Sequence, residues 1–228
     1  PTILTAFLGY ALAAVGLLYD LGRPWNIVQA LFHYGTASVL FEVAWCVMCY
    51  SSVLALEFTV PLFEWLGWAK LYGIMKKALL ALTVLSVMFS TMHQSALGSL
   101  FLLAPTKLHP LWYSPFIPIY FFVSAVIAGL SMVIFESSLS HRIFKSQIEP
   151  NAHVDLDNLT IGLAKAAALV LFAYFFLKLQ GLADGGHWDL LGTPFGMWYL
   201  VEVVGFVLLP SLLFAYGARN GKVRLVRG

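Results

Sequence analysis

Charge is scarce in this chain of 228 residues. Only 11% of its residues are Asp, Glu, Lys or Arg, whereas 61% are hydrophobic and the mean hydropathy is +0.85. Soluble domains carry about 25% charged and about 45–50% apolar residues. The shortage of charge excludes an ordinary soluble domain and predicts an integral membrane protein. The net charge of +2 says little about partners, because the placement of charges matters more than their sum.

Ligands for metals and haem are scarce as well. Cys46 and Cys49 form a single C-x2-C pair inside an apolar stretch, whereas an iron–sulfur cluster or a structural zinc site needs about four ligands. We interpret the two cysteines as small helix-packing residues. Of six histidines only His93 lies within a long apolar run, which excludes two bis-histidine haems and disfavours one. The chain also has no nucleotide-binding motif and no peptidase-like dyad, and we expect no nucleic-acid partner.

Long apolar runs are abundant. A membrane-spanning helix needs about 20 apolar residues, and six stretches qualify or nearly do: 2–19, 39–62, 78–103, 116–139, 159–177 and 195–217. No alternation typical of barrel strands is present, and Pro210 is expected to kink the sixth helix. We predict an all-α, polytopic transmembrane helix bundle that forms one domain over residues 1–228. Because the chain begins at Pro1 and ends on what reads as a loop, we expect it to be a segment of a longer protein.

The segments between the runs alternate in Lys and Arg content. The segments after the first, third and fifth runs hold two such residues together, whereas those after the second, fourth and sixth hold nine. Cytoplasmic segments of membrane proteins are enriched in Lys and Arg. We therefore predict a multi-pass protein of a bacterial or archaeal cytoplasmic membrane, with the tail 218–228 in the cytoplasm and the segment 104–115 outside.

Polar residues interrupt these runs. The stretch Ser90–Ser95 places five polar residues among six in the middle of the third run. Polar groups inside a bilayer are costly and commonly line a cavity, a ligand site or an ion path. Glu42 and Glu57 lie fifteen residues apart on the second helix, roughly 22 Å along its axis and on faces about 60° apart. Both could therefore face one cavity.

The remaining ionisable groups are assigned by depth. We place Glu42, His93 and Glu202 in the outer half of the membrane and Glu57, Glu136 and Lys165 in the inner half, and expect them to face the bundle interior. The alternative is that they are helix-packing hydrogen-bonding groups or interfacial groups whose charged ends reach the membrane surface. Lys178 is interpreted as an interfacial lysine whose ammonium group reaches the outer surface.

Several short runs carry a family resemblance. In chain order they are Asp20-Leu-Gly-Arg23-Pro-Trp25-Asn26, Ser38-Val-Leu-Phe-Glu42, Ala55-Leu-Glu57-Phe58, Leu62-Phe-Glu-Trp-Leu-Gly-Trp68, Thr91-Met-His93-Gln-Ser95, Gly98-Ser-Leu100, Lys107-Leu-His-Pro-Leu-Trp112 and Val133-Ile-Phe-Glu136. In order and spacing, from about residue 9 to 139, the chain resembles the NrfD/PsrC family of membrane subunits. It is most similar to the HybB-like branch, which serves NiFe hydrogenase-2. Beyond that range the resemblance rests on the pattern of spans.

The resemblance implies a fold of eight to ten helices, of which this chain would supply helices three to eight. Family members carry no haem or metal of their own. They bind a quinone, menaquinone or ubiquinone, near the outer face. Their implied partners are the lipid bilayer, a ferredoxin-like iron–sulfur subunit on the periplasmic side, and a NiFe hydrogenase or another periplasmic redox subunit.

The implied function is that of a quinone-reactive membrane subunit of a respiratory redox complex. Such a subunit exchanges electrons between the iron–sulfur subunit and the quinone pool, and coupling to proton translocation is a further expectation. We expect no catalytic residue that acts without the partner subunits. The quinone-binding candidates are Asp20, Arg23, Glu42, His93, Gln94 and Trp112. The proton-relay candidates are Glu42, Glu57, His93, Glu136, Lys165 and Glu202.

Two other classes of function stay open. One is a proton- or ion-translocating module without its own redox chemistry, which does not require the outer Asp20–Trp25 turn. The other is a structural anchor for peripheral redox subunits, which does not require a buried histidine and carboxylates. Asp20 and Arg23 have an alternative interpretation as a helix-end ion pair. The electron donor, the direction of electron flow and the type of quinone are not fixed by the sequence.

Overall fold

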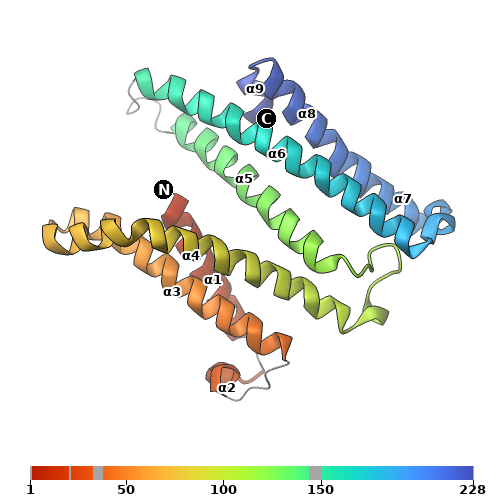
Figure 1. The fold of residues 1–228 in the computed structure, drawn as a ribbon, viewed down its shortest axis with the longest axis horizontal. Coiled ribbons are helices and arrows are strands. Elements are labelled where there is room, and N and C mark those ends of the chain that lie inside the picture. The colour runs from red at the N-terminus through yellow and green to blue at the C-terminus, as the bar shows by residue number, and fades with distance from the viewer. Residues whose placement is uncertain (1, 21, 33–37, 144–149, 228) are drawn as a thin grey trace. The chain divides into compact units, whose positions relative to one another are not determined.

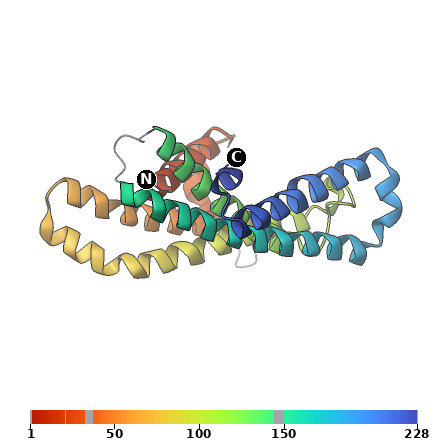
Figure 2. The same cartoon turned by 90° about the horizontal axis from the view of Figure 1, so that it is seen from above.

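The computed structural model describes residues 2–20, 22–32, 38–143 and 150–227, apart from a few side chains within the helices. In this part every regular element is a helix and there is no β-strand (Figures 1 and 2). The packing of the backbone divides it into two compact units, unit 1 (Pro1–Leu100) and unit 2 (Phe101–Gly228).

Five helices in the described ranges are long and apolar enough to cross a membrane. They are Phe41–Trp65, Ala69–Leu102, Ile117–Ser140, Leu156–Gly185 and Pro194–Arg219. A shorter apolar helix, Ile3–Gly16, precedes them. Large apolar side chains such as Leu80, Leu169 and Phe206 stay exposed, as expected for surfaces in contact with lipid. The prediction of an all-α, polytopic membrane helix bundle is confirmed.

Unit 1 is built from five helical elements: α1 (Thr2–Asp20), η1 (Pro24–Val28), α2 (Gln29–Phe32), α3 (Val39–Trp65) and α4 (Ala69–Leu102). α1 packs on α3 (Figure 1). The rings of Phe7 and Phe58 stack in this contact, with their centres 5.6 Å apart. α3 and α4 are joined by a tight turn in which Gly67 adopts a φ of 72°, a conformation that favours glycine. α4 begins before the predicted span at residue 78, so its lysines lie on the helix rather than in a loop.

Unit 2 contains three long helical rods that lie side by side (Figure 1). Its elements are η2 (Pro105–Lys107), α5 (Ile117–Ile143), α6 (Pro150–Gly185), η3 (His187–Gly192), α7 (Pro194–Leu200), η4 (Val201–Leu208), α8 (Leu209–Arg219) and α9 (Val223–Arg227). α6 packs against both α5 and α8. Small residues permit this contact: Ala164 and Ala167 are fully buried. Ser211 of α8 donates a hydrogen bond to the carbonyl oxygen of Ala168 at 3.0 Å.

The sixth predicted span is continuous but not uniform. It consists of α7, η4 and α8, and η4 is π-helical: the backbone N–H of Leu209 donates to the carbonyl oxygen of Val204, five residues earlier. Pro210 follows directly and has no N–H with which to continue an α-helical ladder. The sequence predicted a kink at Pro210, and the structure places a wider helical segment just before it.

The end of unit 2 folds back as a short helix rather than a loop. Gly221 adopts a φ of 63° and reverses the chain between α8 and α9. Val226 of α9 is then buried in a cluster that includes Ile134 and Ala164. Arg227 forms an ion pair with Asp157 at 2.7 Å. These contacts fasten α9 to α5 and α6.

Candidate functional site

His93 is the centre of a polar and aromatic cluster in unit 1. It lies on α4 and only 7% of its surface is exposed. Its ring meets that of Tyr10 on α1 edge to face at 6.1 Å, and the Tyr10 ring in turn contacts Tyr50 on α3 at 4.4 Å. Gln94 forms a side-chain hydrogen bond with Tyr10. Three helices thus converge on one buried imidazole.

The buried imidazole has an unused hydrogen-bonding atom. Within the described ranges, Nδ1 of His93 is buried and has no hydrogen-bond partner. A buried polar atom without a partner costs about 1–3 kcal/mol. A ligand with a polar atom could satisfy it, which makes His93 a candidate ligand-binding residue.

A cavity of about 440 Å³ lies between α3 and α4 of unit 1. Its lining includes Glu42, the free cysteines Cys46 and Cys49, Phe89, and Met92, which precedes His93 in the chain. Glu42 is exposed in the first turn of α3, where the hydroxyl of Ser38 caps the helix by accepting a hydrogen bond from the N–H of Phe41. The cavity therefore combines apolar walls with one carboxylate.

Glu57 lies further along α3 and is 5% exposed. Its Oε1 accepts a hydrogen bond from the hydroxyl of Thr83 on α4 at 3.0 Å. In the described part of unit 1 it forms no ion pair. Glu57 is thus a buried carboxyl group held by a neutral donor, as expected for a group inside a helix bundle.

Asp20 and Arg23 are placed only in part. Asp20 ends α1, and its side chain lies outside the part that the structure describes. Arg23 is exposed immediately before η1. Their assignment to a ligand site, or to a helix-end ion pair, stays a prediction.

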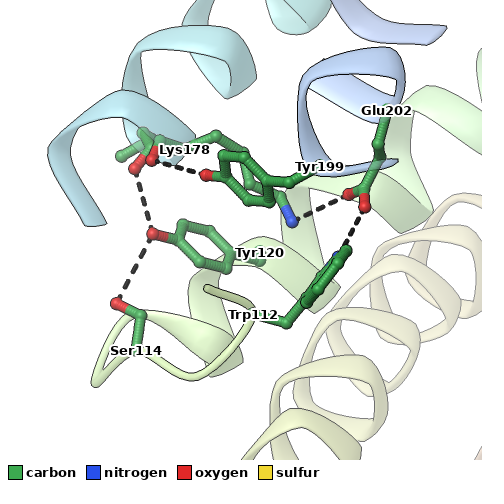
Figure 3. A network of polar contacts seen from close by, with 7 residues as sticks. Trp112, Ser114, Tyr120, Lys178, Tyr199 and Glu202 are labelled. Carbon is green, nitrogen blue, oxygen red and sulfur yellow. Dashed lines mark hydrogen bonds and ion pairs between the residues drawn. The ribbon is translucent and has the colours of Figure 1, made fainter. Parts of the chain in front are cut away.

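A second cluster, which the sequence did not predict, occupies unit 2 (Figure 3). Lys178 of α6 forms an ion pair with Oε1 of Glu202 in η4 at 3.0 Å, and the indole N–H of Trp112 donates to Oε2 of Glu202 at 2.6 Å. Tyr120 of α5 donates to the carbonyl oxygen of Leu177 at 3.0 Å, and Tyr199 of α7 donates to that of Lys178 at 3.2 Å. The cluster connects all three long rods of unit 2.

Aromatic rings surround the ammonium group of Lys178. Its Nζ lies 5.2 Å from the ring centre of Tyr120, 5.6 Å from that of Tyr174 and 5.9 Å from that of Tyr199. These distances suit cation–π attraction. The side chain of Lys178 is 8% exposed and that of Glu202 37%. The interpretation of Lys178 as an interfacial lysine is therefore wrong, because its charge is paired inside unit 2.

The last two relay candidates also belong to unit 2. Glu136 is half-buried on α5 and has at least one interaction with another group. Lys165 is exposed on α6 rather than turned into the interior of unit 2 as expected. Trp112 lies in unit 2 and His93 in unit 1, so their predicted presence at one ligand site stays a prediction.

Part of the second cluster has a signal in the sequence. Tyr174 and Lys178 lie four residues apart on α6, and Tyr199 and Glu202 lie three apart, so each pair shares a helix face. The spacing does not indicate that the face with Tyr174 and Lys178 packs against the face with Tyr199 and Glu202.

The chain is similar to several known proteins. The family described as "Polysulphide reductase, NrfD" matches residues 2–226. A protein of Nitratidesulfovibrio vulgaris (strain Hildenborough) is 46% identical over 228 residues, which are 100% of this chain and 59% of that protein. No solved structure is significantly similar to the chain.

Two proteins of Escherichia coli (strain K12) are also similar. The "Probable Ni/Fe-hydrogenase 2 b-type cytochrome subunit" is 41% identical over 142 residues, which are 61% of this chain and 36% of that protein. "Protein NrfD" is 25% identical over 244 residues, which are 97% of this chain and 74% of that protein. The chain therefore spans less than two thirds of the first two relatives.

Proposed function

The chain belongs to the polysulphide reductase NrfD family, and from this premise we propose that it is the quinone-reactive membrane subunit of a respiratory redox complex. In this role it exchanges electrons between an iron–sulfur partner subunit on the periplasmic side and the quinone pool of the cytoplasmic membrane. The similarity to a hydrogenase-2 subunit supports a redox complex of this kind. A NiFe hydrogenase or another periplasmic oxidoreductase would supply or receive the electrons.

The buried imidazole of His93, whose Nδ1 has no hydrogen-bond partner among the residues that the structure describes, is the observation that carries the proposal. A quinone headgroup needs apolar walls and a hydrogen-bond donor for a carbonyl oxygen. His93 can donate such a bond, and an imidazole has two nitrogen atoms between which a proton can be passed. The cavity along α3 and α4 supplies the apolar walls, and Gln94 and Tyr10 hold further polar atoms beside the imidazole.

Reduction of a quinone to a quinol consumes two electrons and two protons. The electrons come from the partner's iron–sulfur cluster, and the protons must reach the headgroup through this chain. In unit 1 the groups that can carry them are Glu42 at the cavity, His93 buried on α4, and Glu57 further along α3. Because Glu57 lies roughly 22 Å from Glu42 along the helix, water molecules or groups of other helices must complete the path.

The decisive experiment replaces His93 in the whole complex. We expect His93→Ala to lower quinone-linked turnover by about tenfold or more, because it removes both a hydrogen bond between neutral groups, which contributes about 0.5–1.5 kcal/mol, and the group that exchanges the proton. Turnover with a soluble artificial acceptor, which takes electrons from the iron–sulfur partner, should stay near the wild-type rate. His93→Gln should recover part of the binding of quinone but not its proton exchange.

A matched control is His187→Ala, which changes a histidine of the short helix η3, outside the membrane-spanning helices. It should leave both activities unchanged. Equal loss of both activities in His93→Ala would show that His93 supports assembly, and would favour a structural anchor. An unchanged quinone activity would favour an ion-translocating module without redox chemistry at this site.

A further inference from the structure

The cluster around Lys178 leaves a buried donor incompletely used. An ammonium group carries three N–H donors, yet among the described residues Lys178 donates to a single acceptor, Oε1 of Glu202. The other sides of the group face the rings of Tyr120, Tyr174 and Tyr199. An ammonium group in such surroundings can donate a hydrogen bond to one further oxygen atom without breaking its ion pair.

A cavity of about 270 Å³ lies directly beside this donor, and we name it the Lys178 cavity. Its walls are mainly aromatic, formed by Phe101, Trp112, Tyr120 and Phe121 with Tyr174, and Lys178 supplies the charged part of its lining. The rings of Phe101 and Phe121 are 5.3 Å apart. All of these residues belong to unit 2.

The chemistry of the residues that line the cavity limits the class of ligand that it could bind. Lys178 and Glu202 together are neutral, and an anion at the cavity would meet the carboxylate of Glu202 as well as the ammonium. An uncharged ligand with a carbonyl oxygen avoids this repulsion and still accepts from Lys178. Ring walls favour a flat ligand, because aromatic faces stack. Phe101 and Ser124, both exposed, leave a way in from the apolar surface of the unit.

We propose that the Lys178 cavity binds the headgroup of a quinone-class molecule, with one carbonyl oxygen accepting a hydrogen bond from the Lys178 ammonium. A volume of about 270 Å³ suits a headgroup of one or two rings, whereas the isoprenoid tail stays in the lipid. Trp112 has two functions here: its ring forms a wall and its N–H fixes Glu202. The site goes beyond the proposed function at His93, because it uses none of the residues of unit 1.

The experiment uses a photoreactive azido-naphthoquinone on the purified complex, followed by mapping of the labelled peptides. We expect label in the segments 101–124 and 174–178, and we expect an excess of unlabelled naphthoquinone to remove it. Ser124→Leu fills the cavity without touching the ion pair and should lower this label about tenfold. Ser138→Leu is the matched control, since both hydroxyls donate to a carbonyl oxygen of α5 but Ser138 does not line the cavity.

A second variant tests whether the ammonium group of Lys178 donates the hydrogen bond to the ligand. Lys178→Met combined with Glu202→Gln removes both charges, so no unpaired charge stays behind, and should raise the dissociation constant of the probe at this cavity about tenfold. His93→Ala should leave the label in 101–124 intact, which separates this proposal from the function proposed for His93. Absence of label from both segments, undiminished label in Ser124→Leu, or equal labelling by a photoreactive phospholipid would overturn the proposal.

Discussion

Replacing Lys178 with Met tests whether the ion pair in unit 2 stabilises the membrane protein. The change removes the cation but keeps a side chain of similar length. Glu202 then loses its bond at 3.0 Å and keeps the one from Trp112 at 2.6 Å. The three tyrosine rings lose a cation at 5.2–5.9 Å.

The size of the effect follows from the burial of the two partners. Removing one partner of a buried pair costs about 3–5 kcal/mol in soluble proteins, whereas polar contacts between membrane helices average about 0.6 kcal/mol and reach about 1.7. Lys178 is 8% exposed, but Glu202 is 37% exposed and can be partly solvated once its partner is lost. We therefore expect the free energy of unfolding to fall by about 2 kcal/mol.

The assay is reversible unfolding of the purified subunit in mixed micelles, with a control on the same helix. Lys165→Met changes an exposed lysine of α6 and should stay within about 0.5 kcal/mol of wild type. Adding Glu202→Gln to Lys178→Met should restore at least half of the lost stability, because the unpaired charge disappears. If Lys178→Met matched Lys165→Met, or if the two substitutions at the pair were simply additive, the pair would not stabilise unit 2.

Three further predictions follow from the described contacts. Glu57→Gln keeps the hydrogen bond from Thr83 but removes the group that can bind and release a proton. It should slow proton uptake during quinone turnover in reconstituted vesicles without lowering the stability of the protein. If both the rate and the proton uptake matched wild type, Glu57 would be a packing residue. Ser211→Ala deletes the buried bond to Ala168 and should cost about 1 kcal/mol in the same unfolding assay; no change would mean that the helix contact depends on small residues alone. A cysteine placed at Asn220 should react with an impermeant thiol reagent only from the cytoplasmic side, and labelling from outside would reverse the predicted orientation.

The sequence was sufficient to predict the helices, because crossing a bilayer requires long apolar runs and this requirement acts on each helix separately. The sequence predicted the ends of these helices less accurately. α4 and α6 continue beyond the predicted spans at 78–103 and 159–177, since a helix need not stop where the lipid stops. Hydropathy records the apolar part of a helix and not its full length.

The candidate sites were predictable only to the level of single residues. His93 and Glu57 were expected to be buried, and both are. Lys178 was misplaced because its position near the end of α6 suggests an interfacial lysine, whereas its surroundings depend on η4 and α5. A single sequence contains no record of which helix faces meet, so the ion pair with Glu202 could not be predicted.

The π-helical segment η4 sets the rotation of everything that precedes it in the rod. If the same residues were wound as an α-helix, without the wide turn, Tyr199 and Glu202 would turn by about one residue, roughly 100°, relative to Ser211. The hydropathy of the rod would barely change, and its contact with Ala168 through Ser211 would remain. Yet the carboxylate would no longer meet Lys178. The width of the helical turns in this stretch decides which side chains face α6. A change from π-helical to α-helical winding would misalign two helix faces, and no change of side-chain type could realign them.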